Sequence, residues 1–237
     1  MHAVSEIVVT DVAKSYGPVV ALDGVAFRVG LDETVGLVGR SGCGKSTLLR
    51  MVAGLESPEG GAISVGGAGD EGGRLERCAL MPQSDLLMPW RDALGNASLP
   101  LENAGVDRRE ARGRAAELFA ELGLEGFERA RSWELSGGMR QRVAFARTLL
   151  AEKPVLLLDE PFGALDAITR TEMQEWLAAA MGARPRTALL VTHDLDEALR
   201  LCDRVVVLTA RPGRVACELD GSGGGLPARE QALGALR

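Results

Sequence analysis

The stretch that decides the fold is Gly39-Arg40-Ser41-Gly42-Cys43-Gly44-Lys45-Ser46, which matches the pattern G-x-x-x-x-G-K-[ST]. It follows the apolar run 34–38, which predicts a strand, and it precedes leucines and a methionine at helical spacing. Glycines let such a loop turn its backbone N–H groups toward phosphate oxygens, and the following helix N-terminus adds a positive dipole. Lys45 can reach the terminal phosphates, and the Ser46 hydroxyl can bind Mg²⁺. We therefore expect residues 39–46, with the neighbouring Thr47, to bind a nucleotide.

A second pattern, Val155-Leu156-Leu157-Leu158-Asp159-Glu160, places two acids directly after a short apolar run. A strand over 155–158 puts Asp159 at its carboxyl end, facing the phosphate loop, where its carboxylate can help to hold Mg²⁺. Glu160 points elsewhere and is placed to take a proton from an attacking water. By itself this pattern also fits a strand that ends in a capping acid. Together with the phosphate loop, it predicts hydrolysis of a nucleoside triphosphate.

A third stretch narrows the class of nucleotide enzyme. Residues 135–142 read LSGGMRQR and lie shortly before the strand that ends at Asp159. This segment resembles the signature of the ABC ATPases. The resemblance implies ATP and Mg²⁺ as cofactors, and a homodimer in which Ser136, Gly137 and Gly138 of one subunit bind the γ-phosphate of the ATP held by the other. Locally, Ser136 also fits the N-cap of a helix.

Further residues follow in the family's order. The resemblance implies that Gln83 contacts Mg²⁺ and the attacking water, that His193 is the catalytic switch histidine, and that Tyr16 stacks on adenine. Leu165-Asp166 resembles the loop that crosses the dimer interface in this family. Taken alone, His193 also fits a surface histidine, and Tyr16 fits a turn or core aromatic.

The resemblance extends over about residues 7–213. It departs from the family's pattern at residues 132–134, which read Ser-Trp-Glu where many relatives have a proline. Residues 83–90 and 211–214 resemble the nitrate, sulfonate and taurine group of importers, and importers of thiamine-precursor pyrimidines look similar. This likeness implies transmembrane permease subunits and, indirectly, a solute-binding protein as partners. The apolar residues 86–90 would form a groove for a coupling helix of the permease. An ordinary apolar turn is the alternative for them.

Rival classes share the nucleotide motifs. The main alternative is a soluble, non-transport ABC ATPase of the iron–sulfur assembly type, which acts as an interaction module. A chromosome-maintenance ATPase needs a long coiled coil between its motifs, and the sequence from Ser46 to Leu135 contains no heptads. A P-loop kinase would not explain the LSGGMRQR segment.

The alternation of short apolar runs and helical patterns predicts an α/β fold: a P-loop NTPase core of the ABC ATPase type. Residues 7–38 contain β-branched runs and turn signals that predict an N-terminal antiparallel β subdomain. Residues 59–76 are rich in glycine and predict a hairpin with loose loops. We expect a helical subdomain at about 85–150, inserted in a RecA-like core whose parallel sheet is covered on both faces. Residues 1–220 would form one domain, followed by a flexible tail at 221–237.

Composition excludes several other classes of protein. The net charge of −6 argues against a nucleic-acid partner. No apolar run reaches 18 residues, and the first eleven residues lack the pattern of a signal peptide. The four cysteines are scattered and predict free thiols. We expect a chain that stays in the cytoplasm and is peripheral to the bacterial inner membrane.

Overall fold

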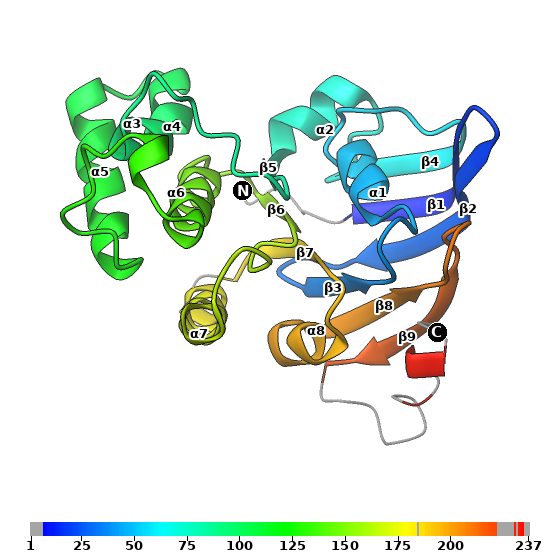
Figure 1. Cartoon of the computed structure of the whole chain (residues 1–237). Coiled ribbons are helices and arrows are strands. Elements are labelled where there is room, and N and C mark those ends of the chain that lie inside the picture. Colours follow the sequence, from blue (N-terminus) through cyan, green and yellow to red (C-terminus); the bar gives the residue numbers. More distant parts are fainter. Residues whose placement is uncertain (1–6, 184, 222–229, 231, 235–237) are drawn as a thin grey trace.

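Two β-sheets form the frame of the protein. The computed structural model describes residues 7–183, 185–221, 230 and 232–234. Figure 1 shows the two sheets on one side of the chain and a group of helices on the other. The predicted flexible tail, residues 221–237, lies mostly outside the described residues. Among the residues that are described, no helix is both long and apolar enough to cross a membrane.

The first sheet is antiparallel and comes from the N-terminal part of the chain. Its order is β2-β1-β4, with bounds β1 Ile7–Tyr16, β2 Val19–Val29 and β4 Gly60–Val65. Along β1 the side chains of Ile7, Val9 and Val12 are buried, because one face of the sheet packs on the core. The predicted N-terminal antiparallel subdomain is confirmed.

The expected hairpin at residues 59–76 is wrong. β4 pairs with β1 rather than with a following strand, and the chain then forms α2 (Glu71–Arg77). Asp70 caps this helix, because its carboxylate accepts a hydrogen bond from the Gly73 N–H at 2.8 Å. The helix cap and the pairing with the free edge of β1 therefore outweigh the tendency of the glycines to form a hairpin turn.

The second sheet has the order β5-β6-β7-β3-β8-β9 and is parallel except for its last strand. Every residue of β6 and β7 is buried, as expected for strands that are covered on both faces. The short β5 and the antiparallel β9 were not predicted from the sequence. The bounds are β3 Thr34–Val38, β5 Cys78–Met81, β6 Val155–Asp159, β7 Thr187–Thr192, β8 Arg204–Leu208 and β9 Val215–Asp220.

Helix α1 (Lys45–Val52) lies between the two sheets. Its Leu48, Leu49 and Val52 are buried in one core that also contains residues of β1 and β3. On the other face of the second sheet, α8 (Leu195–Leu201) packs against β3, β7 and β8. The sheet is therefore held firmly on both sides, and its loops start from fixed strand ends.

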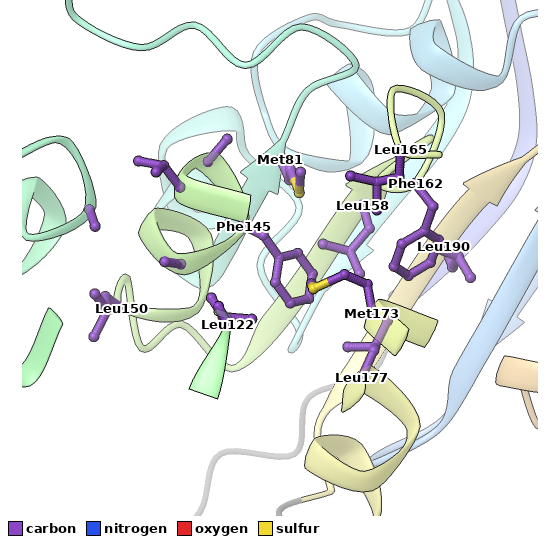
Figure 2. Packing of buried hydrophobic residues seen from close by; sticks show 14 of the residues in the cluster. Met81, Leu122, Phe145, Leu150, Leu158, Phe162, Leu165, Met173, Leu177 and Leu190 are labelled. Atoms are coloured by element: carbon purple, nitrogen blue, oxygen red, sulfur yellow. The ribbon is translucent and has the colours of Figure 1, made fainter. Parts of the chain in front are cut away.

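The remaining helices lie beside the sheets (Figure 1). They are α3 (Ala93–Ala97), α4 (Leu99–Asn103), α5 (Arg108–Glu121) and α6 (Gly137–Leu149), with α7 (Ala167–Ala183) next to them. Figure 2 shows Phe145 of α6 directed toward Met173 of α7, close to Leu158 and Leu190 of the sheet. Phe145 also meets Trp176 edge to face, with 5.7 Å between ring centroids. Helix α6 therefore joins the helices to the sheet.

Candidate functional site

The predicted site residues meet at the carboxyl edge of the second sheet. Parallel strands place their carboxyl ends at the same edge, where open α/β sheets bind their ligands. The phosphate loop follows β3. Asp159 is the last residue of β6 and Glu160 follows it, while His193 follows β7. Gln83 lies two residues after β5. Residues that are far apart in sequence are therefore brought to one place by strand direction alone.

The phosphate loop takes a conformation that requires its glycines. Gly44 has a φ of +102°, and a Cβ there would lie 2.6 Å from Cδ2 of Leu22 and 3.0 Å from the carbonyl oxygen of Ala21. Helix α1 begins directly after it and has neither a side-chain cap nor an acidic residue in its first turn. Its N–H groups and positive dipole are therefore available to an anion.

Lys45 is buried and held by the loop itself. Its Nζ donates hydrogen bonds to the carbonyl oxygens of Gly39 at 2.7 Å and Arg40 at 3.1 Å. Only 5% of the residue is exposed. The ammonium group is thus fixed at the inner side of the loop, where it can meet a polyphosphate.

A cation fits beside Asp159. This residue is 6% exposed, and its Oδ1 has no hydrogen-bond partner among the described residues. Burial raises the pKa of the Asp159 carboxyl, while a hydrogen bond with the Ser46 hydroxyl lowers it. An unpartnered carboxylate oxygen next to a serine hydroxyl offers the hard oxygen ligands that Mg²⁺ prefers. The residues present therefore suit the metal site predicted from the sequence.

Glu160 stands between the other two predicted catalytic residues. Its Oε2 accepts a hydrogen bond from Nε2 of Gln83 at 3.2 Å, and its Oε1 lies 3.4 Å from Nδ1 of His193. The backbone of Glu160 has a φ of 47°, and its N–H donates to the carbonyl of Val191 at 2.8 Å. Such a left-handed conformation is strained for a residue other than glycine. It turns the Glu160 side chain away from the direction of Asp159 and toward the pocket.

Tyr16 lines the same pocket and is anchored through its hydroxyl group. The hydroxyl donates to Oε1 of Glu56 at 2.5 Å and accepts a hydrogen bond from Nη2 of Arg50 at 3.5 Å. Lys14 Nζ lies 5.6 Å from the ring centroid. The residue remains 43% exposed, so the ring is anchored but can stack on a flat ligand.

The structure does not bring the signature residues into this pocket. Ser136 caps α6 by accepting a hydrogen bond from the Met139 N–H at 3.2 Å, as expected from the sequence. Ser136 and Gly137 are exposed, and Gly138 is half-buried beside Leu165. Residues 132–134, which replace the family's proline, form a short 3₁₀ turn ahead of them.

The pocket also includes residues that sequence reasoning missed. Val19, Ala21 and Arg211 line it together with the predicted ones. Arg211 lies in a segment singled out only for its likeness to importers, and nothing in its spacing pointed to the phosphate loop. The pocket measures about 230 Å³ and is lined by Tyr16, Val19, Ala21, Ser41, Gly42, Gly44, Lys45, Ser46, Thr47, Gln83, Glu160 and Arg211.

A second groove of about 520 Å³ lies toward the helices and reaches the predicted metal site, because its lining includes Ser46 and Asp159. Its apolar lining includes Leu55, Leu80, Pro82, Leu86 and Leu99. Leu86 is 64% exposed and Trp90 is 72% exposed, so both suit contact with a partner.

Leu87, expected in the groove as part of residues 86–90, is instead buried in the core at 9% exposure. Leu86, directly before it, faces the solvent instead.

Comparison with known proteins gives consistent similarities. Residues 22–163 match the family described as ABC transporter. The taurine import ATP-binding protein TauB of Sinorhizobium fredii is 46% identical over 201 residues, which cover 85% of this chain and 75% of the relative. The aliphatic sulfonates import ATP-binding protein SsuB 1 of Rhodococcus jostii is 50% identical over 194 residues, covering 82% of this chain and 75% of the relative.

Solved structures show the same fold. The dimeric structure of MJ0796, a bacterial ABC transporter cassette, has a TM-score of 0.84 and 30% sequence identity, and the match covers 92% of this chain and 99% of that one. The same protein in a dimeric post-hydrolysis state, bound to ADP and Pi, gives the same values.

Proposed function

This chain belongs to the ABC transporter family of ATP-hydrolysing proteins, and on that premise we propose that it is the ATPase subunit of a bacterial importer. Two chains would pair head to tail and enclose two ATP molecules. The pair would bind transmembrane permease subunits at the cytoplasmic side of the inner membrane, as a peripheral component. Two of the relatives are named for the import of taurine and of aliphatic sulfonates, so small sulfonates are the first transported substrates to test.

One observation carries the dimer proposal: among the described residues, the N-termini of α1 and α6 both suit phosphate, and of these two that of α1 alone opens into the chain's own pocket. Helix α1 begins at the phosphate loop, which lines the pocket. Helix α6 begins at the exposed Ser136 and Gly137, without an acidic residue in its first turn. A second chain that presents its α6 to this pocket would use both. The dimeric MJ0796 structures, similar in fold, support this arrangement.

Hydrolysis then follows from the placement of the acids. Mg²⁺, when bound, neutralises charge on the phosphates. The ion would be held by Ser46, by Asp159 and by the side-chain amide oxygen of Gln83. Glu160 takes the proton of a water whose oxygen attacks the γ-phosphorus, the bond between this phosphorus and the bridging oxygen of the β-phosphate breaks, and ADP and phosphate are released. The neighbouring His193 keeps the Glu160 carboxylate in place.

The decisive experiment substitutes Glu160→Gln, which keeps the shape and removes the base. A positioned general base contributes about 10²–10⁴ in rate, so hydrolysis should fall by that order while ATP affinity stays the same. Because ATP is no longer consumed, size-exclusion chromatography with Mg-ATP should show a dimer for the variant and mostly monomer for the unaltered chain.

Glu152→Gln is the matched control. Glu152 also has a positive φ, of 52°, but it pairs with Arg114 and does not line the nucleotide pocket. It should hydrolyse ATP normally and remain a monomer. A normal rate for Glu160→Gln would show that Glu160 is not the base. A slow variant that never dimerises would contradict the shared site and leave the role of Glu160 intact.

A further inference from the structure

A turn near the end of the described chain packs directly on the phosphate loop. This turn, residues 209–214, follows β8, which is a parallel neighbour of β3 with Val38 opposite Val207. Since the two strands end at the same edge, the segment after β8 must lie beside the segment after β3. Nothing in the local sequence of the turn indicates this contact.

The turn is held rigidly by backbone and side-chain hydrogen bonds. The Gly213 N–H donates to the Ala21 carbonyl at 2.9 Å, and the Asp23 N–H donates to the Gly213 carbonyl at 3.1 Å. The approach to the phosphate loop is so close that a Cβ on Gly213 would lie 2.2 Å from the carbonyl oxygen of Cys43. Within the turn, the Thr209 N–H donates to the Arg214 carbonyl at 2.9 Å. The turn is thus a fixed platform against the loop.

Arg211 projects from this platform onto a single loop carbonyl. Its Nε and Nη2 both donate to the Gly42 oxygen, at 3.0 Å and 2.8 Å. Hydrogen bonds from a charged donor are about twice as strong as neutral ones. Arg211 also lines the nucleotide pocket, and Gly42 has a φ of +80°, so the held peptide belongs to a part of the loop whose conformation favours glycine.

Holding this carbonyl fixes the direction of the next N–H group. A peptide unit is planar and trans, so the Gly42 carbonyl and the Cys43 N–H point in opposite directions. The Cys43 N–H donates to the Arg40 carbonyl at 3.2 Å, and Lys45 Nζ donates to the same oxygen at 3.1 Å. The Arg211 contact therefore keeps the Cys43 N–H on the side of the loop where Lys45 stands.

We propose that Arg211 is a positioning residue of the nucleotide site: it holds the Gly42 carbonyl on the side of the loop opposite Lys45, and it keeps the Cys43 N–H on the Lys45 side, where the polyphosphate would bind. The role rests on the proposed function of the phosphate loop. It applies to ATP and ADP alike, because the loop it orients receives the part that both nucleotides share. A loop that is already oriented loses less conformational entropy when a nucleotide binds, so Arg211 acts mainly on the affinity for the nucleotide.

The test compares Arg211→Ala with Arg214→Ala in the full chain. Arg214 lies in the same turn but pairs with Asp23 and makes no hydrogen bond to Gly42. Calorimetric titration should show about tenfold weaker binding of both ATP and ADP for Arg211→Ala, the size expected for losing a charged hydrogen-bond donor. KM for ATP should rise by a similar factor while kcat changes much less. Arg214→Ala should bind both nucleotides within about twofold of the unaltered chain.

Further variants keep the experiment decisive. Arg211→Lys retains the charge but offers one donor group in place of the fork, and should recover part of the lost affinity. Thermal melts of each variant show whether a loss of binding is a loss of folding, and Arg211→Lys replaces the alanine variant if that one unfolds. Unchanged affinity in Arg211→Ala, or an equal loss in Arg214→Ala, would overturn the proposal. Failure of the unaltered chain to bind ATP would instead contradict the proposed function itself.

Discussion

The carboxyl edge of the second sheet and the neighbouring helices contribute functional residues in opposite ways. At the sheet edge, the lysine and the glutamate already have partners in the same chain: Lys45 Nζ binds two loop carbonyls, and Glu160 lies between Gln83 and His193. Among the helices, the hydroxyl of Ser136 bonds within the described residues only to its own helix, and Trp90 is largely exposed.

This difference indicates where the missing partners are. Groups that are satisfied within one chain are preorganised for a small ligand, which they can bind without help. Exposed groups at a helix N-terminus or on an apolar surface gain their interactions only from another chain. Variants at the sheet edge should therefore fail in the isolated chain, whereas variants among the helices should fail only when a second copy of the chain or the permease is present.

The largest effect is expected for Lys45→Ala. It removes the buried charge that we expect to meet the terminal phosphates, so binding of ATP at micromolar concentrations should be abolished. Calorimetry on the isolated chain measures this directly, with Lys153→Ala as a control at a lysine outside the pocket lining. Unchanged affinity in Lys45→Ala would refute the assignment of the phosphate loop.

Asp159→Asn should damage binding and catalysis together. The amide keeps the shape but weakens the ligand for Mg²⁺, so we expect a loss on the order of 10² in hydrolysis. The diagnostic readout is metal dependence: EDTA should weaken ATP binding by the unaltered chain, while the variant should bind weakly with or without Mg²⁺. An equal response of the two proteins to EDTA would place the metal elsewhere.

Ser136→Ala tests the other side of the comparison. ATP affinity of the isolated chain should not change, because Ser136 does not line its pocket. Hydrolysis should fall about tenfold or more, since the second chain loses a donor to the γ-phosphate. Because Ser136 is also the N-cap of α6, the variant should lose about 1 kcal/mol of stability. Ser136→Asn, which can still cap the helix, separates the two effects in a thermal melt. Weaker ATP binding by the Ser136→Ala monomer would contradict the division between the two regions.

The smallest effect on the isolated chain is expected at the exposed apolar surface. Leu86→Glu and Trp90→Glu should leave basal ATP hydrolysis within about twofold, yet weaken association with the permease by placing a charge in an apolar contact. Co-purification with membrane fractions measures this. Leu75→Glu, at an exposed leucine of α2, is the matched control. Full membrane association of the Leu86 and Trp90 variants would show that this surface does not bind the permease.

Sequence patterns predicted the parts of the protein whose chemistry is local. Three features each consist of a few adjacent residues: the phosphate loop, the two acids at the end of β6 and the cap of α6. Backbone geometry and side-chain type therefore specify them without distant contacts. The family resemblance was confirmed by the match over residues 22–163. It also named Gln83 and His193, which the structure then placed on either side of Glu160.

Tertiary structure decided what depends on neighbours that are distant in sequence. Residues 59–76 look like a hairpin because glycines read as turns, but β4 found its partner in β1. Leu87 looks like its exposed neighbour Leu86, and only packing shows that it belongs to the core. Arg211 reaches Gly42 because β8 runs parallel to β3, a pairing that no local pattern encodes. The sequence by itself determines which groups are suited to phosphate and metal. Strand order determines which of these groups share one pocket, because the sheet places the ends of strands that are distant in sequence next to one another.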